Sequence, residues 1–129
     1  LLFDPLSGMP GGFKAIIDFE EACHYYLIFE LGMGILGVCV NDITVDLDKA
    51  RALVDGYQQV RPLAQIEKES LQLFVRYAAV AKSYWRFNKY NIEEPGEDRA
   101  GHHWQMVQIA KEVAEISTTR FFDAIFSAD

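Results

Sequence analysis

Hydrophobic and polar positions follow two different patterns along this chain. Near the start, short apolar segments at residues 1–3 and 13–17 flank a segment rich in proline and glycine. A turn-forming segment between two apolar runs predicts a β-hairpin over residues 1–18. From residue 25 onward, apolar residues recur at helical spacing. The chain is therefore predicted to be α+β and mostly helical, with one hairpin and four or five helices.

Three segments carry the strongest helical patterns. Residues 25–40 are almost wholly apolar, with Glu30 as the only charged residue, and predict a buried helix. Residues 47–59 have one apolar face and follow Asp46, which can cap the helix start. Residues 64–90, which follow Pro62, contain no glycine and no proline. They predict a single helix of about 40 Å at the centre of the helical layer.

Two further helices are expected near the end of the chain. A loop at 91–101 contains Pro95 and Gly96. After it, an amphipathic helix is predicted over residues 102–117, with its inward face formed by His103, Met106, Val107, Ala110, Val113 and Ala114. Thr118 or Thr119 is expected to cap a short last helix over residues 120–126.

Composition narrows the class of protein. The chain has 129 residues, enough for one domain with a core, and its net charge of −7 argues against nucleic-acid binding. The apolar run at 25–40 includes Glu30 and is shorter than a bilayer span, so no membrane segment is expected. Cys23 and Cys39 are too few for a disulfide framework, which favours free thiols in a reducing cytoplasm.

Two carboxylates stand out as candidates for chemistry. Asp18 follows the β-branched run at 15–17, which is expected to be a buried strand end. A carboxylate at the end of a buried strand is held rigidly and can still reach a ligand, which suits a metal site. The alternative is that Asp18 caps the turn or helix that follows. Glu30 lies within an apolar helix and would need a hydrogen-bonding or charged partner if buried.

The order of several short motifs resembles a known family. Over roughly residues 1–90, the chain is similar to the C-terminal lobe of the aminoglycoside phosphotransferase/choline kinase superfamily, which has a protein-kinase-like fold. The similarity is greatest to its homoserine kinase branch. The residues that carry it are Ile17-Asp18-Phe19, Ala22-Cys23, Glu30-Leu31, Gly56-Tyr57 and Val60-Arg61-Pro62-Leu63.

This resemblance implies roles for the two carboxylates. Asp18 would bind the Mg²⁺ ions that accompany the ATP phosphates. Glu30 stands where the family has an aspartate that braces the catalytic loop. Its side chain is one methylene longer, so it is either a buried brace or a satisfied core carboxylate. The family's catalytic loop, with its Asp and Asn, would precede Leu1, so no catalytic residue is expected in this chain.

The resemblance also suggests an acceptor site. Glu20, Glu21 and His24 follow the metal-binding end of the hairpin, where they could line the site or form a solvated linker. Arg86 lies on the long helix, which shapes the substrate pocket in the family. The neighbouring His102 and His103 lack the spacing of zinc ligands.

Two functional hypotheses follow. In the first, residues 1–129 are the helical part of a C-terminal kinase lobe, with a hairpin at 1–18 and a helical subdomain at 25–129. The start at Leu1 without Met suggests a fragment, inactive alone, whose partners are its missing N-terminal part and a small hydroxyl substrate. The whole enzyme would transfer phosphate from ATP to homoserine or a related amino alcohol, with hydroxylysine and methylthioribose as alternatives. In the second hypothesis, the chain is a non-enzymatic helical interaction domain.

Overall fold

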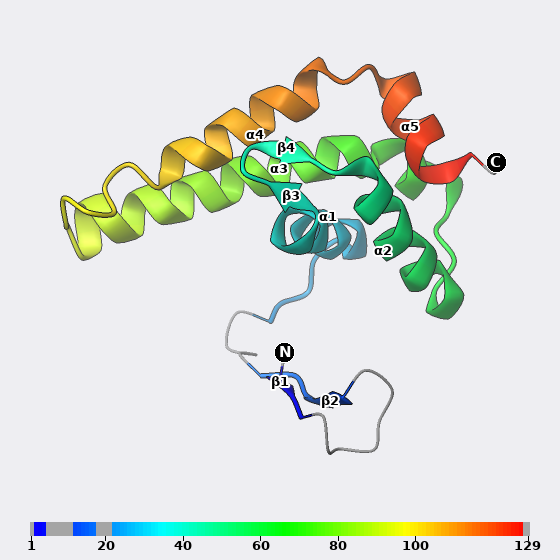
Figure 1. Ribbon diagram of the computed structural model, residues 1–129, viewed down its shortest axis with the longest axis horizontal. Helices are drawn as coiled ribbons and strands as arrows, with labels where there is room; N and C mark the ends of the chain where they lie inside the picture. The colour runs from blue at the N-terminus through cyan, green and yellow to red at the C-terminus, as the bar shows by residue number, and fades with distance from the viewer. Residues whose placement is uncertain (1, 5–11, 18–21, 128–129) are drawn as a thin grey trace.

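The chain begins with the predicted hairpin. A computed structural model describes residues 2–4, 12–17 and 22–127. Strands β1 (Leu2–Phe3) and β2 (Phe13–Ala15) pair antiparallel, with Leu2 opposite Ala15. The hairpin lies apart from the helices (Figure 1). Ile16 and Ile17 are exposed beyond the end of β2, so the prediction of a buried strand end at residues 15–17 is wrong. No core surrounds those side chains.

Helix α1 (Leu27–Val38) is the predicted apolar helix, two residues shorter at each end. One face is buried, at Ile28, Leu31, Gly32, Ile35 and Leu36. A second small hairpin follows, formed by β3 (Val40–Asn41) and β4 (Thr44–Val45). Its turn places Asp42 at a φ of 57°, a conformation that Asp tolerates better than most residues. The sequence prediction treated this segment only as the exit from a helix.

Helix α2 (Leu47–Val60) confirms the predicted cap. The Lys49 backbone N–H donates to Asp46 Oδ1 at 3.0 Å. That bond is the main reason why the pKa of the Asp46 carboxyl lies below its usual value. Asn41, on β3, donates to the other Asp46 oxygen at 3.3 Å, so the cap also joins the second hairpin to α2.

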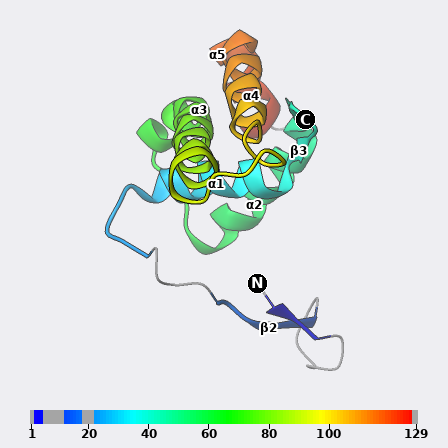
Figure 2. The same cartoon turned by 90° about the vertical axis from the view of Figure 1, so that its left-hand side faces the viewer.

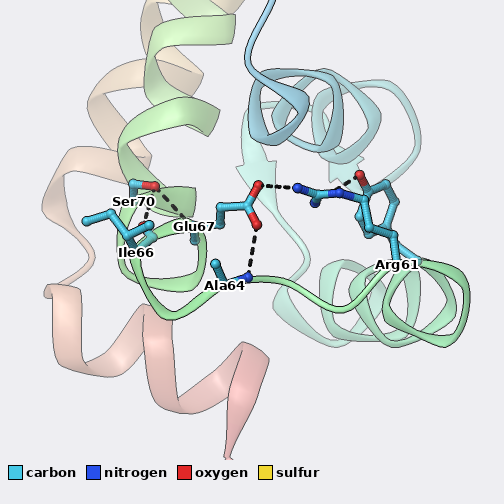
Figure 3. A network of polar contacts seen from close by, with 6 residues as sticks. Arg61, Ala64, Ile66, Glu67 and Ser70 are labelled. Carbon is cyan, nitrogen blue, oxygen red and sulfur yellow. Dashed lines mark hydrogen bonds and ion pairs between the residues drawn. The ribbon is translucent and has the colours of Figure 1, made fainter.

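Helix α3 (Gln65–Asn88) is the predicted long helix and continues as a π-helical segment, η2 (Lys89–Glu93). Its first turn is fixed by Glu67, which accepts from the Ala64 backbone N–H at 2.9 Å and from Arg61 Nη2 at 2.7 Å (Figure 3). Figure 2 views α3 and α4 nearly end-on, with α1 crossing beneath them. The contacts agree, since α1 and α4 both pack closely on α3.

The last two helices are α4 (His103–Glu115) and α5 (Thr118–Phe126). Ser117 caps α5 by accepting from the Arg120 N–H at 3.2 Å, so the prediction of a threonine cap is wrong by one residue. On α4, Ile109 is fully buried. Ala114 is exposed, so the prediction that it belongs to the inward face of this helix is wrong. Helix α5 packs against α2 and closes the helical layer.

The core joins all five α-helices. Its largest fully buried side chains are Phe121, Ile35, Leu71, Ile109, Ile125, Val54, Val75, Val113 and Cys39. Within the described residues, no helix is both long and apolar enough to cross a membrane. The structure therefore confirms a mostly helical chain with small antiparallel strand pairs.

Candidate functional site

The candidate residues from the sequence fall in three regions. Asp18, Glu20 and Glu21 lie outside the described residues. His24 and Glu30 lie near the start of α1, and both are exposed. Arg86 lies near the C-terminal end of the long helix α3. The described structure can therefore place three of the six candidates.

Glu30 is not buried, contrary to both alternatives drawn from the sequence. It lies in the first turn of α1, about 200° around the helix from the buried Ile28 at 100° per residue. The buried face of α1 packs mainly on α3, and Glu30 lies on the opposite side, where it is exposed with respect to the described residues. Within this chain, Glu30 therefore needs no buried partner, and its carboxylate is accessible to another group.

A hollow of about 280 Å³ lies beside Glu30. It is lined by the segment that leads into α1 and by the helix's first two turns, at Ala22, Cys23, Tyr25, Tyr26, Leu27, Phe29, Glu30 and Met33. Cys23 is an exposed free thiol there. Among the described residues that line it, Glu30 is the only charged one, and most of their surface in the hollow is apolar.

A cluster of aromatic rings adjoins this hollow. The Tyr26 ring contacts Phe74 and the Phe29 ring contacts Tyr77, both on α3, with ring centroids 5.9 and 5.4 Å apart. The Tyr25 ring contacts Tyr26 and Phe29, with centroids 5.3 and 5.2 Å apart. A second hollow, also about 280 Å³, is lined by Leu73 and by four of these rings. The two hollows share Tyr25 and Tyr26, so they adjoin each other at the surface.

Tyr25 and Tyr77 are joined by a hydrogen bond across that surface. The Tyr25 hydroxyl donates to the Tyr77 hydroxyl at 3.2 Å. This bond is the main cause that raises the pKa of Tyr25 above its usual value. Both tyrosines are about half exposed, so this hydrogen bond joins the segment before α1 to α3 at the surface of the molecule.

Arg86 belongs to a different hollow, of about 480 Å³, lined by Asp42, Ile43, Arg86, Gly101, His102 and Gln105. Its guanidinium donates to the His102 carbonyl and to Gln105 Oε1, each at 3.0 Å. Gln105 in turn donates to the Asp42 carbonyl at 2.9 Å. Arg86 thus ties the end of α3 to the start of α4. This hollow shares no lining residue with the one beside Glu30.

No ready-made metal centre is found among the residues whose placement is described. They contain no group of three or more His, Cys, Asp or Glu side chains that could hold a metal ion. The predicted ligand, Asp18, lies outside them. Carboxylate oxygen is the ligand type that Mg²⁺ prefers, so Asp18 fits that ion by its chemistry alone.

The aromatic surface was missed in the sequence analysis, although the sequence contains a signal for it. Tyr25, Tyr26 and Phe29 stand at the start of the apolar run, and Phe74 and Tyr77 are three residues apart on the long helix. Aromatic residues at helical spacing usually indicate core. Only the packing of α1 on α3 shows that these rings gather at a surface.

Comparison with known proteins finds similarity to homoserine kinases. The chain is 34% identical over 83 residues to the homoserine kinase of Methylobacillus flagellatus, a match that covers 64% of this chain and 26% of that protein. It is 37% identical over 92 residues to the Caulobacter vibrioides homoserine kinase, covering 70% and 27%. For the Bartonella henselae homoserine kinase, the identity is 36% over 96 residues, covering 74% and 28%.

These matches set the extent of the similarity. The chain spans about a quarter of the length of the curated relatives that it matches. No protein-family model matches the sequence, and no solved structure matches it. The chain is thus related in sequence to part of the homoserine kinases.

Proposed function

We propose that this chain forms part of an ATP-dependent kinase that phosphorylates the hydroxyl group of homoserine or a related amino alcohol. The observation that carries the proposal is the 34–37% identity to homoserine kinases over most of the chain. Hydroxylysine and methylthioribose are alternative acceptors of the same class. The fold proposed for the whole enzyme is protein-kinase-like, with this chain as the helical part of its C-terminal lobe.

The described residues would position groups in such a kinase rather than react themselves. Glu30 is exposed at the start of α1, where its carboxylate can accept hydrogen bonds from a loop packed against this face. That loop would be the catalytic loop, supplied by the rest of the kinase. His24, with Glu20 and Glu21, would lie near the acceptor. ATP with Mg²⁺ would bind through Asp18 and residues that the rest of the kinase supplies.

Arg86 is not part of this proposal. Its guanidinium already has two acceptors, one on the N-cap residue His102 and one on α4, and its hollow shares no lining residue with the one beside Glu30. An arginine that is committed to joining two helices is less free to bind a substrate. We propose that Arg86 supports the end of the long helix instead.

The metal role of Asp18 can be tested in a chimera in which this chain replaces the matching segment of the Methylobacillus flagellatus kinase. Asp18→Asn removes the charge but keeps the size, and should reduce homoserine-dependent ADP release by about 100-fold or more, which is over 2.7 kcal/mol of transition-state stabilisation. Asp98→Asn is the matched control, because the Asp98 side chain is 80% exposed in a loop. Equal rates in the two variants would reject the metal role.

Glu30→Gln in the same chimera tests the bracing role. The isolated chain should keep its unfolding temperature, since Glu30 is exposed there. The chimera should lose about tenfold in turnover, because the amide provides one acceptor oxygen where the carboxylate provides two. Unchanged turnover of the Glu30→Gln chimera would show that Glu30 does not brace a loop that the reaction needs.

The alternative of a non-enzymatic interaction domain draws support from one observation. Many large apolar side chains are exposed along α3 and at the start of α1. Contiguous apolar patches of this kind mark surfaces that bind other protein. The chimera separates the two functions, because an interaction domain would give no homoserine-dependent ADP release.

A further inference from the structure

The outward side of α3 carries a stripe of six large apolar residues and one serine. Its positions follow a strict alternation of four- and three-residue steps along the helix: Ile66, Ser70, Leu73, Tyr77, Val80, Tyr84 and Phe87. We name these seven residues the outer stripe. Its six large side chains are between 42% and 71% exposed. A stripe this long on one helix is more than scattered surface apolar residues.

The outer stripe faces away from the helices that cover α3. The buried residues of α3 are Leu71, Val75, Ala78, Ala79 and Ser83. At 100° per residue, the middle of the stripe lies roughly opposite the middle of this buried set. Helices α1, α4 and α5 therefore occupy the other side of α3. Two stripe residues do contact other elements: Tyr77 contacts Tyr25 and Phe29 at the start of α1, and Phe87 contacts His103 on α4. All six large side chains of the stripe nevertheless stay at least 42% exposed.

The spacing indicates what kind of partner fits. Steps of four and three residues have a mean period of 3.5, which is the period at which two helices stay in contact along their whole length. No stripe position carries a charge. The fitting partner is therefore an amphipathic helix with an apolar face of the same period.

The outer stripe is continuous with the candidate site. Leu73 and Tyr77 belong to the stripe and also line the hollow that contains Tyr25 and Tyr26. Those two rings also line the hollow beside Glu30. A helix seated on the stripe would thus pass, near the middle of the stripe, the hollow that adjoins the one beside Glu30, whose carboxylate is proposed to brace the catalytic loop.

The size of the stripe argues against a freely diffusing partner. A 24-residue helix is about 36 Å long, and a contact about 10 Å wide covers about 360 Å². A stable complex of two separate proteins needs about 800 Å² on each partner. A covalently linked segment needs less area, because linkage raises its local concentration into the millimolar range.

The relatives supply a candidate for that segment. The matches cover only 26–28% of each homoserine kinase, so nearly three quarters of each relative has no counterpart in this chain. We propose that the outer stripe is the docking face for an amphipathic helix from that remaining part of the kinase. The identity of the partner rests on the proposed function, whereas the need for a helical cover rests on the stripe itself.

The test compares one double variant in two settings. Leu73→Lys/Tyr84→Lys places charges at two positions of the stripe that are 62% and 71% exposed in this chain. Val60→Lys is the matched control, because Val60 is 90% exposed at the end of α2 and lies off the stripe. Each variant is made in the isolated chain and in the chimera with the Methylobacillus flagellatus kinase, and the thermal unfolding temperature is measured for all of them.

In the isolated chain, both variants should change the unfolding temperature by less than about 2 °C. In the chimera, the double variant should lower it by about 5 °C or more, and the control should not. Equal tolerance of both variants in the chimera would overturn the proposal. A wild-type chimera that does not fold would also count against the docking proposal, because it would show that the rest of the kinase does not pack on the stripe.

Two further measurements separate the remaining outcomes. Sedimentation of the isolated chain should show a monomer, and a dimer that the double variant dissociates would assign the stripe to a second copy instead. Homoserine-dependent ADP release is recorded on the same chimeras. A folded, stripe-sensitive but inactive chimera would overturn the proposed function alone, and an active chimera that tolerates the double variant would overturn the docking alone.

Discussion

At the scale of single residues, Gly32 decides how closely α1 can approach α3. A Cβ atom at this position would lie 2.9 Å from the backbone oxygen of Phe74, which cannot move aside as a flexible side chain can. Gly37 lies on the same helix with nothing within 4 Å of its added Cβ. The two glycines therefore provide a matched pair with opposite expectations.

Gly32→Ala should lower the free energy of unfolding by about 2 kcal/mol, because the two helices must separate. Gly37→Ala should raise it by about 0.5 kcal/mol, because alanine favours helix and meets no obstacle. Urea denaturation of the isolated chain measures both changes. A Gly32→Ala variant as stable as the wild type would show that α1 and α3 do not pack as closely as described.

Glu67 makes the stability of the chain depend on pH. Its hydrogen bond from Arg61, followed by the one from the Ala64 N–H, lowers the pKa of the folded Glu67 carboxyl below its usual value. A lowered folded-state pKa gives stabilisation that is present above the unfolded-state pKa and is lost as pH falls through the folded one.

Glu67→Gln should therefore lower the unfolding temperature by about 4 °C at pH 7 and have little effect near about pH 2. Thermal melts of the wild type and the variant across that range test the expectation. Glu97→Gln, at an exposed loop position, controls for general charge effects. A difference that stays constant over the range would mean that the Glu67 charge plays no part.

At the scale of elements, Gln72 joins α3 to the end of α4. Its amide group donates to the carbonyls of Val113 and Ile116 at 3.0 and 2.7 Å. These carbonyls belong to the last turn of α4 and its C-cap, where helical partners are missing. The Gln72 side chain thus caps the C-terminus of α4, just before the connection to α5.

Gln72→Met keeps the length of the side chain and removes its donors. The free energy of unfolding should fall by about 1–2 kcal/mol, because part-buried carbonyls lose their partner. Gln108→Met is the control, since Gln108 is exposed on the outward side of α4. Urea denaturation measures the two variants, and equal stability would show that water replaces the amide without loss.

The elements also show what sequence patterns can and cannot predict. The long helix α3 and the Asp46 cap of α2 follow from local chemistry, and both were predicted. The β3–β4 hairpin was missed, because the strands are two residues each and Asn41 with Asp42 also fits a helix exit. The exposure of Glu30 could not be predicted, because it depends on which face of α1 another helix covers.

At the scale of the whole molecule, the described helices form one core, and one face exposes many large apolar side chains. The start of α1, the aromatic cluster and the outer stripe all belong to that face. The hairpin β1–β2 lies apart from it (Figure 1). Exposed apolar side chains of this number are typical of a surface that contacts other protein.

Homoserine-dependent ADP release by the chimera is the most direct test of the central claim, that this chain is part of a homoserine kinase-like phosphotransferase. If the chain has this role, the chimera should release ADP with homoserine present, within about 100-fold of the unaltered Methylobacillus flagellatus kinase, and should release little without it. A folded chimera whose ADP release is the same with and without homoserine, hydroxylysine or methylthioribose would contradict the account.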